Sequence, residues 1–163
     1  MANDNFIIYE EEITRIEAIM SRMLQSAEAK CALLVDKDGH LITRQGFTHS
    51  LDTTALAALL AGSFASTKEI ARLVGEPEFS VLFHQGKKDH IHMCLIGERS
   101  ILVVIFDDRT TIGMVRLCAK ETAAELTKVF DEISQNSQAK AASAVSDDFA
   151  SMAQDKLDDI FQD

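Results

Sequence analysis

Three histidines, His84, His90 and His92, are the residues of this sequence whose type and spacing best suit a metal site. If residues 79–84 and 90–96 form a hairpin, the register that matches their apolar side chains puts His84 opposite His90, with His92 on the same face. Imidazole is a common zinc ligand. However, two lysines in the intervening turn repel a cation, and no carboxylate or thiol completes a ligand set. We therefore expect a polar strand face and no bound metal.

A second polar cluster, Asp107-Asp108-Arg109, follows a strongly apolar run and precedes an amphipathic one. Loops at strand ends often carry functional groups, so a catalytic role is one interpretation. The other is structural: the aspartates cap the helix that follows, and the arginine offsets their charge. We favour the structural interpretation.

The usual enzyme motifs are missing from the sequence. Its seven glycines never stand at the spacing of the phosphate-binding loops G-x-G-x-x-G or G-x-x-x-x-G-K-[ST]. No serine lies in G-x-S-x-G, and no segment carries H-E-x-x-H. We therefore expect a protein without an active site of its own and without a cofactor.

Length and composition restrict the class of protein further. A chain of 163 residues suits one domain plus an extension. Its three cysteines are widely separated and lie in apolar segments, which is typical of buried, reduced thiols in a cytosolic protein. A net charge of −10 disfavours nucleic acid and anionic membranes as partners. No apolar run has the length of a membrane span, and no signal peptide is recognisable. We expect a cytoplasmic protein whose partners are proteins.

Hydrophobic periodicity predicts an alternation of helices and antiparallel strands. The predicted elements are a helix over 10–24, strands over 31–36 and 40–46 joined at Asp38-Gly39, a helix over 52–74, strands over 79–84, 90–96 and 100–107, and a helix from 111. Residues 101–106 are apolar at every position, so both faces of this strand should be covered. The pattern places it at the centre of a sheet, with the apolar strand 31–36 beside it.

The helix over 52–74 is predicted to begin at Asp52, which can cap it, and to end at Gly75. It carries an apolar band and a second line of small residues. The band is Leu56, Leu59, Leu60, Ile70 and Leu73; the small residues are Thr54, Ala58, Ala61 and Ala65. The helix is either an ordinary core helix or one that packs the band on its own sheet and offers the small residues to another chain.

The end of the chain divides into two segments by composition. Residues 135–146 are small and polar, which indicates a flexible linker after a domain formed by 1–134. Residues 147–163 regain an amphipathic helical pattern, with six aspartates against one lysine, an excess of five negative charges. So short a helix is marginal alone. It could dock on its own domain or fray, but we favour a partner-binding segment.

The order helix, hairpin, helix, three-strand meander, helix resembles the Roadblock family of dynein-light-chain-like domains. Within that family the chain is most similar to bacterial cell-polarity regulators. The matching stretches are YEEEITRIEA (9–18), LVDKDGHLI (34–42), LDTTALAALLAG (51–62), LVVIFDDRTTIGMVRL (102–117) and DDIFQD (158–163). Together these motifs cover essentially the whole chain.

The resemblance implies an α/β (α+β) three-layer sandwich: a five-stranded antiparallel sheet with helices in the order α-β-β-α-β-β-β-α, plus a C-terminal amphipathic helix. It implies a homodimer whose two chains bind one GTP-loaded, Ras-like small GTPase of the MglA type. The dimer would stimulate GTP hydrolysis by reordering the GTPase switch regions, in cell polarity and gliding motility, in the cytoplasm and in polar clusters. The GTPase-binding residues that it implies are Ala58, Ala61, Ala65 and Glu69 in the central helix, and Phe149, Met152, Leu157, Ile160 and Phe161 in the tail.

Two alternatives stay open at this point. Arg72 and Arg109 are the arginines that could act as a finger on the GTPase, although the resemblance implies activation without one. A dimeric scaffold that binds a GTPase without stimulating hydrolysis would also fit the same sequence.

Overall fold

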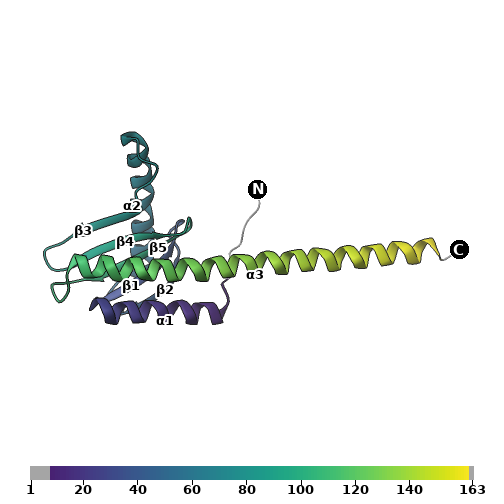
Figure 1. The fold of residues 1–163 in the computed structure, drawn as a ribbon, viewed down its shortest axis with the longest axis horizontal. Coiled ribbons are helices and arrows are strands. Elements are labelled where there is room, and N and C mark those ends of the chain that lie inside the picture. The colour runs from purple at the N-terminus through teal and green to yellow at the C-terminus, as the bar shows by residue number, and fades with distance from the viewer. Residues whose placement is uncertain (1–7, 162–163) are drawn as a thin grey trace.

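Three helices and five strands make up residues 8–161, the part of the chain that the computed structural model describes (Figure 1). Their order is the predicted one, and the predicted fold class is confirmed. In chain order they are α1 (Glu10–Ala27), β1 (Cys31–Asp36), β2 (Leu41–Gly46), α2 (Thr53–Val74), β3 (Val81–Gln85), β4 (His90–Ile96), β5 (Ser100–Phe106) and α3 (Ile112–Ile160).

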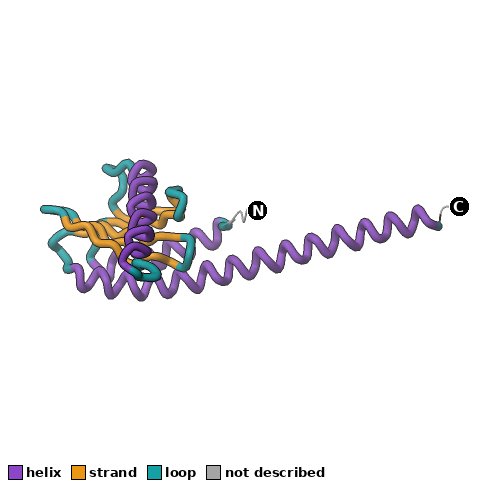
Figure 2. Tube along the Cα trace, turned by 90° about the horizontal axis from the view of Figure 1, so that it is seen from above, coloured by secondary structure: helices purple, strands orange, loops and turns teal. Residues whose placement is uncertain are grey.

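The strands form one antiparallel sheet in the order β2-β1-β5-β4-β3. β5 is buried at every position and lies between β1 and β4, as its uninterrupted apolar run predicted. α1 and α3 cover one face of the sheet and α2 covers the other (Figures 1 and 2). Two separate hydrophobic clusters fill the two interfaces, so the molecule is a three-layer sandwich.

Local signals define the ends of α2 and the first hairpin. The Asp52 carboxylate accepts the Ala55 N–H at 3.0 Å, and Gly75 ends the helix in the left-handed conformation (φ 81°). In the β1–β2 turn the Asp36 carboxylate accepts two backbone N–H groups, those of Asp38 and His40, both at 2.9 Å. Gly39 supplies the positive φ of 94° that the turn requires.

The predicted register of the β3–β4 hairpin is wrong by one residue. His84 pairs with Ile91, and Gln85 pairs with His90. Such a slip moves every side chain to the opposite face. His90 and His92 therefore face α3, whereas His84 lies on the α2 face. Matching apolar residues gave the wrong register because β3 is an exposed edge strand, so burial constrains its pairing weakly.

The flexible linker predicted at 135–146 is not present in the structure. α3 runs without interruption from Ile112 to Ile160, 49 residues, or about 70 Å at the rise of an α-helix. The segment contains no glycine or proline, and four of its residues are alanine, the strongest helix former. An apolar stripe is missing because this part of the helix does not contact the core, and not because the segment is not helical.

α3 consists of two parts that differ in their surroundings. The packed half, residues 112–133, buries seven side chains, of which Ile133 is the last. Arg22 and Glu125 join α1 to this half at 2.9 Å, and Arg15 and Glu132 form a second ion pair along the same antiparallel contact. The projecting half, residues 134–160, extends beyond the sheet (Figures 1 and 2). Within residues 8–161, no helix has both the length and the apolar character needed to cross a membrane.

Candidate partner-binding surfaces

One candidate surface is the outward side of α2, which is more apolar than we predicted. Leu59, Ile70, Leu73 and Val74 are all more than half exposed, with Leu73 at 76 %, and together they form the outer α2 surface. The predicted core position of Leu59, Ile70 and Leu73 is therefore wrong. At helical spacing these residues lie on the side of α2 opposite Ala57, Leu60 and Phe64, which pack on the sheet, so no strand covers them. α2 also extends past the sheet (Figure 1).

The small residues of α2 have mostly structural partners within the chain. Ala61 is only 4 % exposed and packs on the sheet, which corrects its predicted place on a partner surface. Ala58 is exposed but lies against the β1–β2 turn: a Cβ added to Gly39 would come within 3.0 Å of the Ala58 Cα. Small side chains at these two positions let the sheet and the turn approach the helix. Of the three predicted alanines, Ala65 is the one that combines exposure with a neighbouring groove.

That groove lies between α2 and the end of the sheet and encloses about 330 Å³. Ala65 and Phe64 line it from α2, and Phe79, Leu95 and Ile101 line it from the strands and their approach. Charged side chains of both signs, among them Lys68 and Glu98, also belong to its lining. An apolar side chain of a partner, framed by polar groups, would fit this lining.

Glu69 is exposed one turn beyond Ala65. Its carboxylate accepts a hydrogen bond from Arg72 Nε at 3.1 Å. Both side chains are about 70 % exposed, so water screens the pair and it adds little to stability. Either residue can exchange this contact for one with a partner.

The second candidate surface is β3, an edge strand of the sheet. β3 pairs with β4 on one side, and among residues 8–161 no strand pairs with it on the other. Val81 and Phe83 on this strand are 43 % and 38 % exposed. An exposed apolar edge is a template for pairing with another strand. β3 therefore offers backbone hydrogen bonds and apolar side chains to one partner at once.

The third candidate surface is the apolar side of the projecting half of α3. All five residues predicted in this segment are exposed, and none is buried by the domain: Phe149, Met152, Leu157, Ile160 and Phe161. Four lie within α3 and Phe161 is its C-cap. Docking of the tail on its own domain, one of the three interpretations, is not what this structure shows. At helical spacing, the aspartates of the segment lie mainly on the opposite side of the helix.

The histidines are not gathered into one site. His90 accepts the Gly86 N–H at Nδ1, 3.2 Å away, and its Nε2 lies 3.5 Å from the Asp108 carboxylate. His92 is 2 % exposed, and within the described residues its Nδ1 has no hydrogen-bond partner. Burial lowers the pKa of His92, and the positive charge of Arg116 lowers it further. His92 is thus a neutral residue of the interface between the sheet and α3.

The Asp107-Asp108-Arg109 cluster is organised around an ion pair. Arg109 donates to the Asp107 carboxylate from Nε at 2.9 Å and from its backbone N–H at 3.1 Å. The hydrogen bonds from Arg109 hold the pKa of Asp107 below its usual value. The helix cap is Thr111, which accepts the Met114 N–H at 3.3 Å, so the aspartates do not cap α3 as we suggested. The contacts of the cluster fit the structural interpretation. Arg109 offsets the charge of Asp107, as predicted, but Thr111 caps the helix in place of the aspartates.

The thiols are equally unsuited to chemistry. All three cysteines are buried and free, as predicted. Burial raises the pKa of the Cys31 thiol to about 11 and that of Cys94 to about 12. Because the thiolate is the reactive form, these groups are poor nucleophiles near neutral pH. Within the described residues, the exposed apolar surfaces of α2, β3 and α3 are therefore the main candidates for a functional site.

Comparison with known proteins agrees with the fold. The model of the Roadblock/LC7 domain matches residues 15–106. MglB of Myxococcus xanthus is 48 % identical, with 78 % of this chain and 96 % of that one covered and a TM-score of 0.74. The gliding protein MglB of Thermus thermophilus is 27 % identical, covering 80 % and 99 %, with a TM-score of 0.73. An MglB in a tetrameric arrangement is also 27 % identical, covering 81 % and 99 %, with a TM-score of 0.75.

The matched region includes all five strands, α2 and most of α1, whereas the whole of α3 lies beyond it. This fold is not a known catalytic fold. Its order of elements, its central β5 and its edge strand β3 are the features on which the candidate surfaces depend. The chain belongs to the Roadblock/LC7 domain family and is similar to MglB.

Proposed function

We propose that this chain is a homodimeric activator of a small Ras-like GTPase of the MglA type, acting in cell polarity and gliding motility. The observation that carries the proposal is the 48 % identity with Myxococcus xanthus MglB over 78 % of the chain. The cytoplasm, including polar clusters, is the proposed location. The activator has no active site of its own and binds neither nucleic acid nor membrane.

The homodimer would form through β3 and the outer α2 surface. Two β3 strands paired antiparallel would join two sheets through their edges, and Leu73 and Val74 would be covered at the same time. Both regions are apolar and exposed in the single chain. Antiparallel pairing of one strand with its own copy is compatible with two-fold symmetry, the commonest symmetry of homodimers.

One GTPase would bind to two copies of this chain. Ala65 and the groove beside it, with Glu69 at the rim, are the proposed contact on α2. In phosphoryl transfer to water, a residue that positions the attacking water and contacts that stabilise charge limit the rate. Pressing the switch regions into that arrangement accelerates hydrolysis without a donated arginine. In this proposal neither Arg72, which pairs with Glu69, nor Arg109, which pairs with Asp107, acts on the nucleotide, so alanine at either position should leave the stimulation intact.

The projecting half of α3 would supply a second contact with the GTPase, away from the nucleotide. A helix with an apolar side and acidic flanks suits a groove that is apolar at its floor and basic at its rim. This contact sets affinity, whereas the α2 contact sets the rate of hydrolysis. The tail from 147 onward is the proposed binding segment, even though it continues α3 without a linker.

The test is GTP hydrolysis by an MglA-type GTPase with and without this protein. We expect faster hydrolysis at saturating concentration, and loss of the acceleration for Ala65→Arg. Ala124→Arg on the solvent side of α3 is the matched control, since that residue is exposed and lies outside the proposed contacts. Ala61→Arg is unsuitable because it would force a guanidinium into the core. Binding without any acceleration would identify a scaffold instead of an activator.

The dimer is tested separately by sedimentation. Val81→Lys should shift the protein from dimer to monomer, because it places a charge at the proposed seam. Val145→Lys makes the same change on the projecting half and should leave the dimer intact. A dimer that withstands Val81→Lys would place the seam elsewhere without affecting the activation claim.

A further inference from the structure

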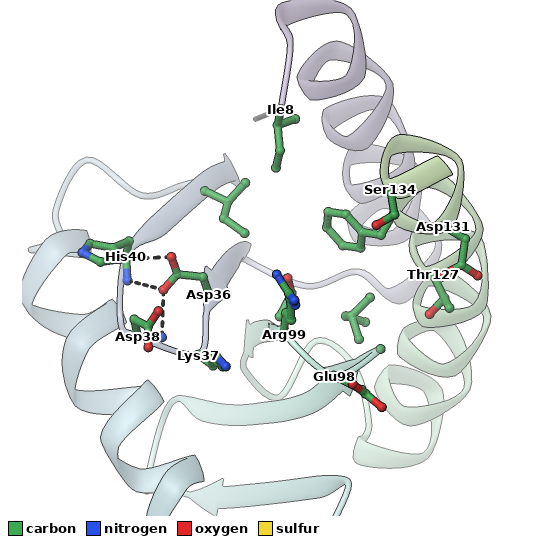
Figure 3. A pocket seen from close by; sticks show the side chains of 15 residues that line it. Ile8, Asp36, Lys37, Asp38, His40, Glu98, Arg99, Thr127, Asp131 and Ser134 are labelled. Carbon is green, nitrogen blue, oxygen red and sulfur yellow. Dashed lines mark hydrogen bonds and ion pairs between the residues drawn. The ribbon is translucent and has the colours of Figure 1, made fainter. Parts of the chain in front are cut away.

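The projecting half of α3 leaves the domain at a cavity of about 650 Å³. Figure 3 shows Thr127, Asp131 and Ser134 of α3 on one side of this cavity and His40 of the β1–β2 turn on the other. Ser134 is the last α3 residue in the lining. Every residue from 138 to 160 is exposed, so beyond the cavity the domain buries none of the side chains of this helix.

A repeat typical of coiled coils runs along this exposed helix. Steps of four, three, four, three and four residues separate the members of one side, which we call the heptad side: Gln138, Ala142, Val145, Phe149, Met152 and Lys156. Alternating steps of three and four average 3.5 residues, the repeat that keeps one side of a helix facing a second helix. The three large apolar residues of the heptad side are at least 66 % exposed. The helix therefore presents a coiled-coil surface that is uncovered in the single chain.

The other sides of the projecting half do not compete for this role. Lys140, whose Nζ lies 4.5 Å from the Tyr9 ring centroid, comes two positions before Ala142 and is thus on the opposite side of the helix. Asp147 and Asp158 also lie opposite the heptad side at helical spacing. The heptad side is therefore the apolar side of this helix, and contact with the domain leaves it open.

Charge selects the direction in which a second copy of this chain fits the heptad side. In a parallel pair each residue meets its own copy, so Lys156 would face Lys156. Residues 147–163 carry an excess of five negative charges, whereas residues 134–146 contain one lysine and no acidic residue. A parallel pair would place the two acidic ends together, and an antiparallel pair places each beside the uncharged root of the other helix. Because close like charges repel, the antiparallel direction is favoured.

One antiparallel register satisfies the whole heptad side. By two-fold symmetry, each of its three kinds of pair occurs twice: Phe149 with Val145, Ala142 with Met152, and Gln138 with Lys156. In the two apolar pairs a larger side chain meets a smaller one, as interlocking packing requires. The lysine meets an amide oxygen that can accept its N–H. A shift by one heptad would instead put Lys156 against Val145, or Phe149 against Gln138.

We propose that the projecting halves of two chains pair antiparallel through the heptad side. Residues 138–156 of each chain take part, over about 28 Å, and Val145, Phe149 and Met152 become buried. The inference does not depend on the proposed function, because the pair forms from this chain alone. The apolar side of the projecting half is also the proposed GTPase contact, so pairing and GTPase binding exclude each other.

Cross-linking of the full chain with a short bismaleimide tests direction and register. In the proposed register Ala139 of one chain lies beside Ala153 of the other, whereas two copies of Ala139 are about 20 Å apart along the axis. An equimolar mixture of Ala139→Cys and Ala153→Cys should therefore cross-link several-fold more than either variant alone. The native cysteines are buried, and the parent protein measures their background.

Two outcomes of this experiment would overturn the proposal. In a parallel pair, each cysteine variant would cross-link with itself as well as the mixture does. Without any pairing, the mixture would stay at the background of the parent protein. Adding Val81→Lys to both cysteine variants should leave the cross-link unchanged, which separates this contact from the proposed dimer at β3.

Sedimentation at rising protein concentration measures the strength of the pairing. A coiled coil of fewer than three heptads is weak, so we expect association beyond the β3 dimer only at high concentration. Val145→Lys places a charge within the pair and should weaken this step at least about tenfold, since a lysine in a coiled-coil core lowers stability. Ala144→Lys adds the same charge away from the heptad side and is the matched control. Equal weakening by the two variants would overturn the proposal.

Discussion

The packed and projecting halves of α3 form one continuous helix, but different interactions stabilise them. In the packed half, apolar side chains such as Leu126 are fully buried against the sheet, so the helix is stabilised by tertiary contacts. In the projecting half, Phe149 is 75 % exposed, and helical propensity must hold the backbone. The same secondary structure therefore serves the fold in one half and is available for recognition in the other.

The largest expected effect is a difference in the free energy of unfolding between alanine variants of two leucines in α3. Leu126→Ala removes a buried side chain and should lower the free energy of unfolding by about 2–5 kcal/mol. Leu157→Ala truncates a half-exposed side chain and should change it by less than about 0.5 kcal/mol. Urea denaturation of the two variants measures both. A similar loss for Leu157→Ala would mean that the tail packs on its own domain.

The next prediction tests continuity between the halves. Ala142→Pro should break the helix in the segment first taken for a linker, because proline in a helix interior costs about 3 kcal/mol. Far-UV circular dichroism should show a loss of helix. Ala142→Gly, at about 1 kcal/mol, should show a smaller one. Equal spectra for the proline variant and the parent protein would indicate that residues 135–146 are a flexible linker and not helix.

Recognition by the projecting half should respond to a single charge. Phe149→Asp should weaken GTPase binding at least about tenfold, or about 1.4 kcal/mol, because the apolar side loses an aromatic anchor. Ser151→Asp adds the same charge on the other side of the helix and is the matched control. Calorimetric titration measures affinity, and sedimentation should show an unchanged dimer. Equal affinities for the two variants would mean that the apolar side of the projecting half does not contact the GTPase.

The smallest effect concerns pH and should arise at the interface between the sheet and the packed half of α3, where His92 of β4 is buried. The pKa of buried His92 is lowered in the folded protein, so the unfolded chain binds the proton more readily. The stability that neutral His92 contributes is present above its unfolded pKa, about 6.5, and is lost as pH falls below it. Replacing it by leucine should flatten the decline in unfolding free energy between about pH 7 and 5. Parallel curves for the two proteins would contradict this.

Signals that lie close together in sequence predicted their structures well. Asp52 and Gly75 defined both ends of α2, and the unbroken apolar run of β5 placed it at the centre of the sheet. Each depends on residues within a few positions or on burial of a whole segment. The order of elements and the fold class could therefore be obtained without coordinates.

Features that depend on distant geometry could not be read in this way. Leu59 and Leu73 are apolar like core residues, and they are exposed because they lie on the side of α2 away from the sheet. Ala61 and Ala65 are the same amino acid four positions apart, yet the sheet buries the first and not the second. The candidate site could thus be assigned to α2 from sequence, but not to the correct side of it.

The length of the projecting half has a consequence for how a bound partner would be held. Its helix, residues 134–160, reaches about 40 Å, so a molecule gripped at the tip stays within that radius of the domain. Where the helix can reach a second contact on the same partner, that contact forms within the complex and binding is tighter than through either contact alone. A homodimer would carry two projecting halves. One GTPase could bind both of them, or it could bind one and leave the other open to a second GTPase. The length of the projecting half thus affects how many GTPases a dimer can bind, as well as how tightly it binds them.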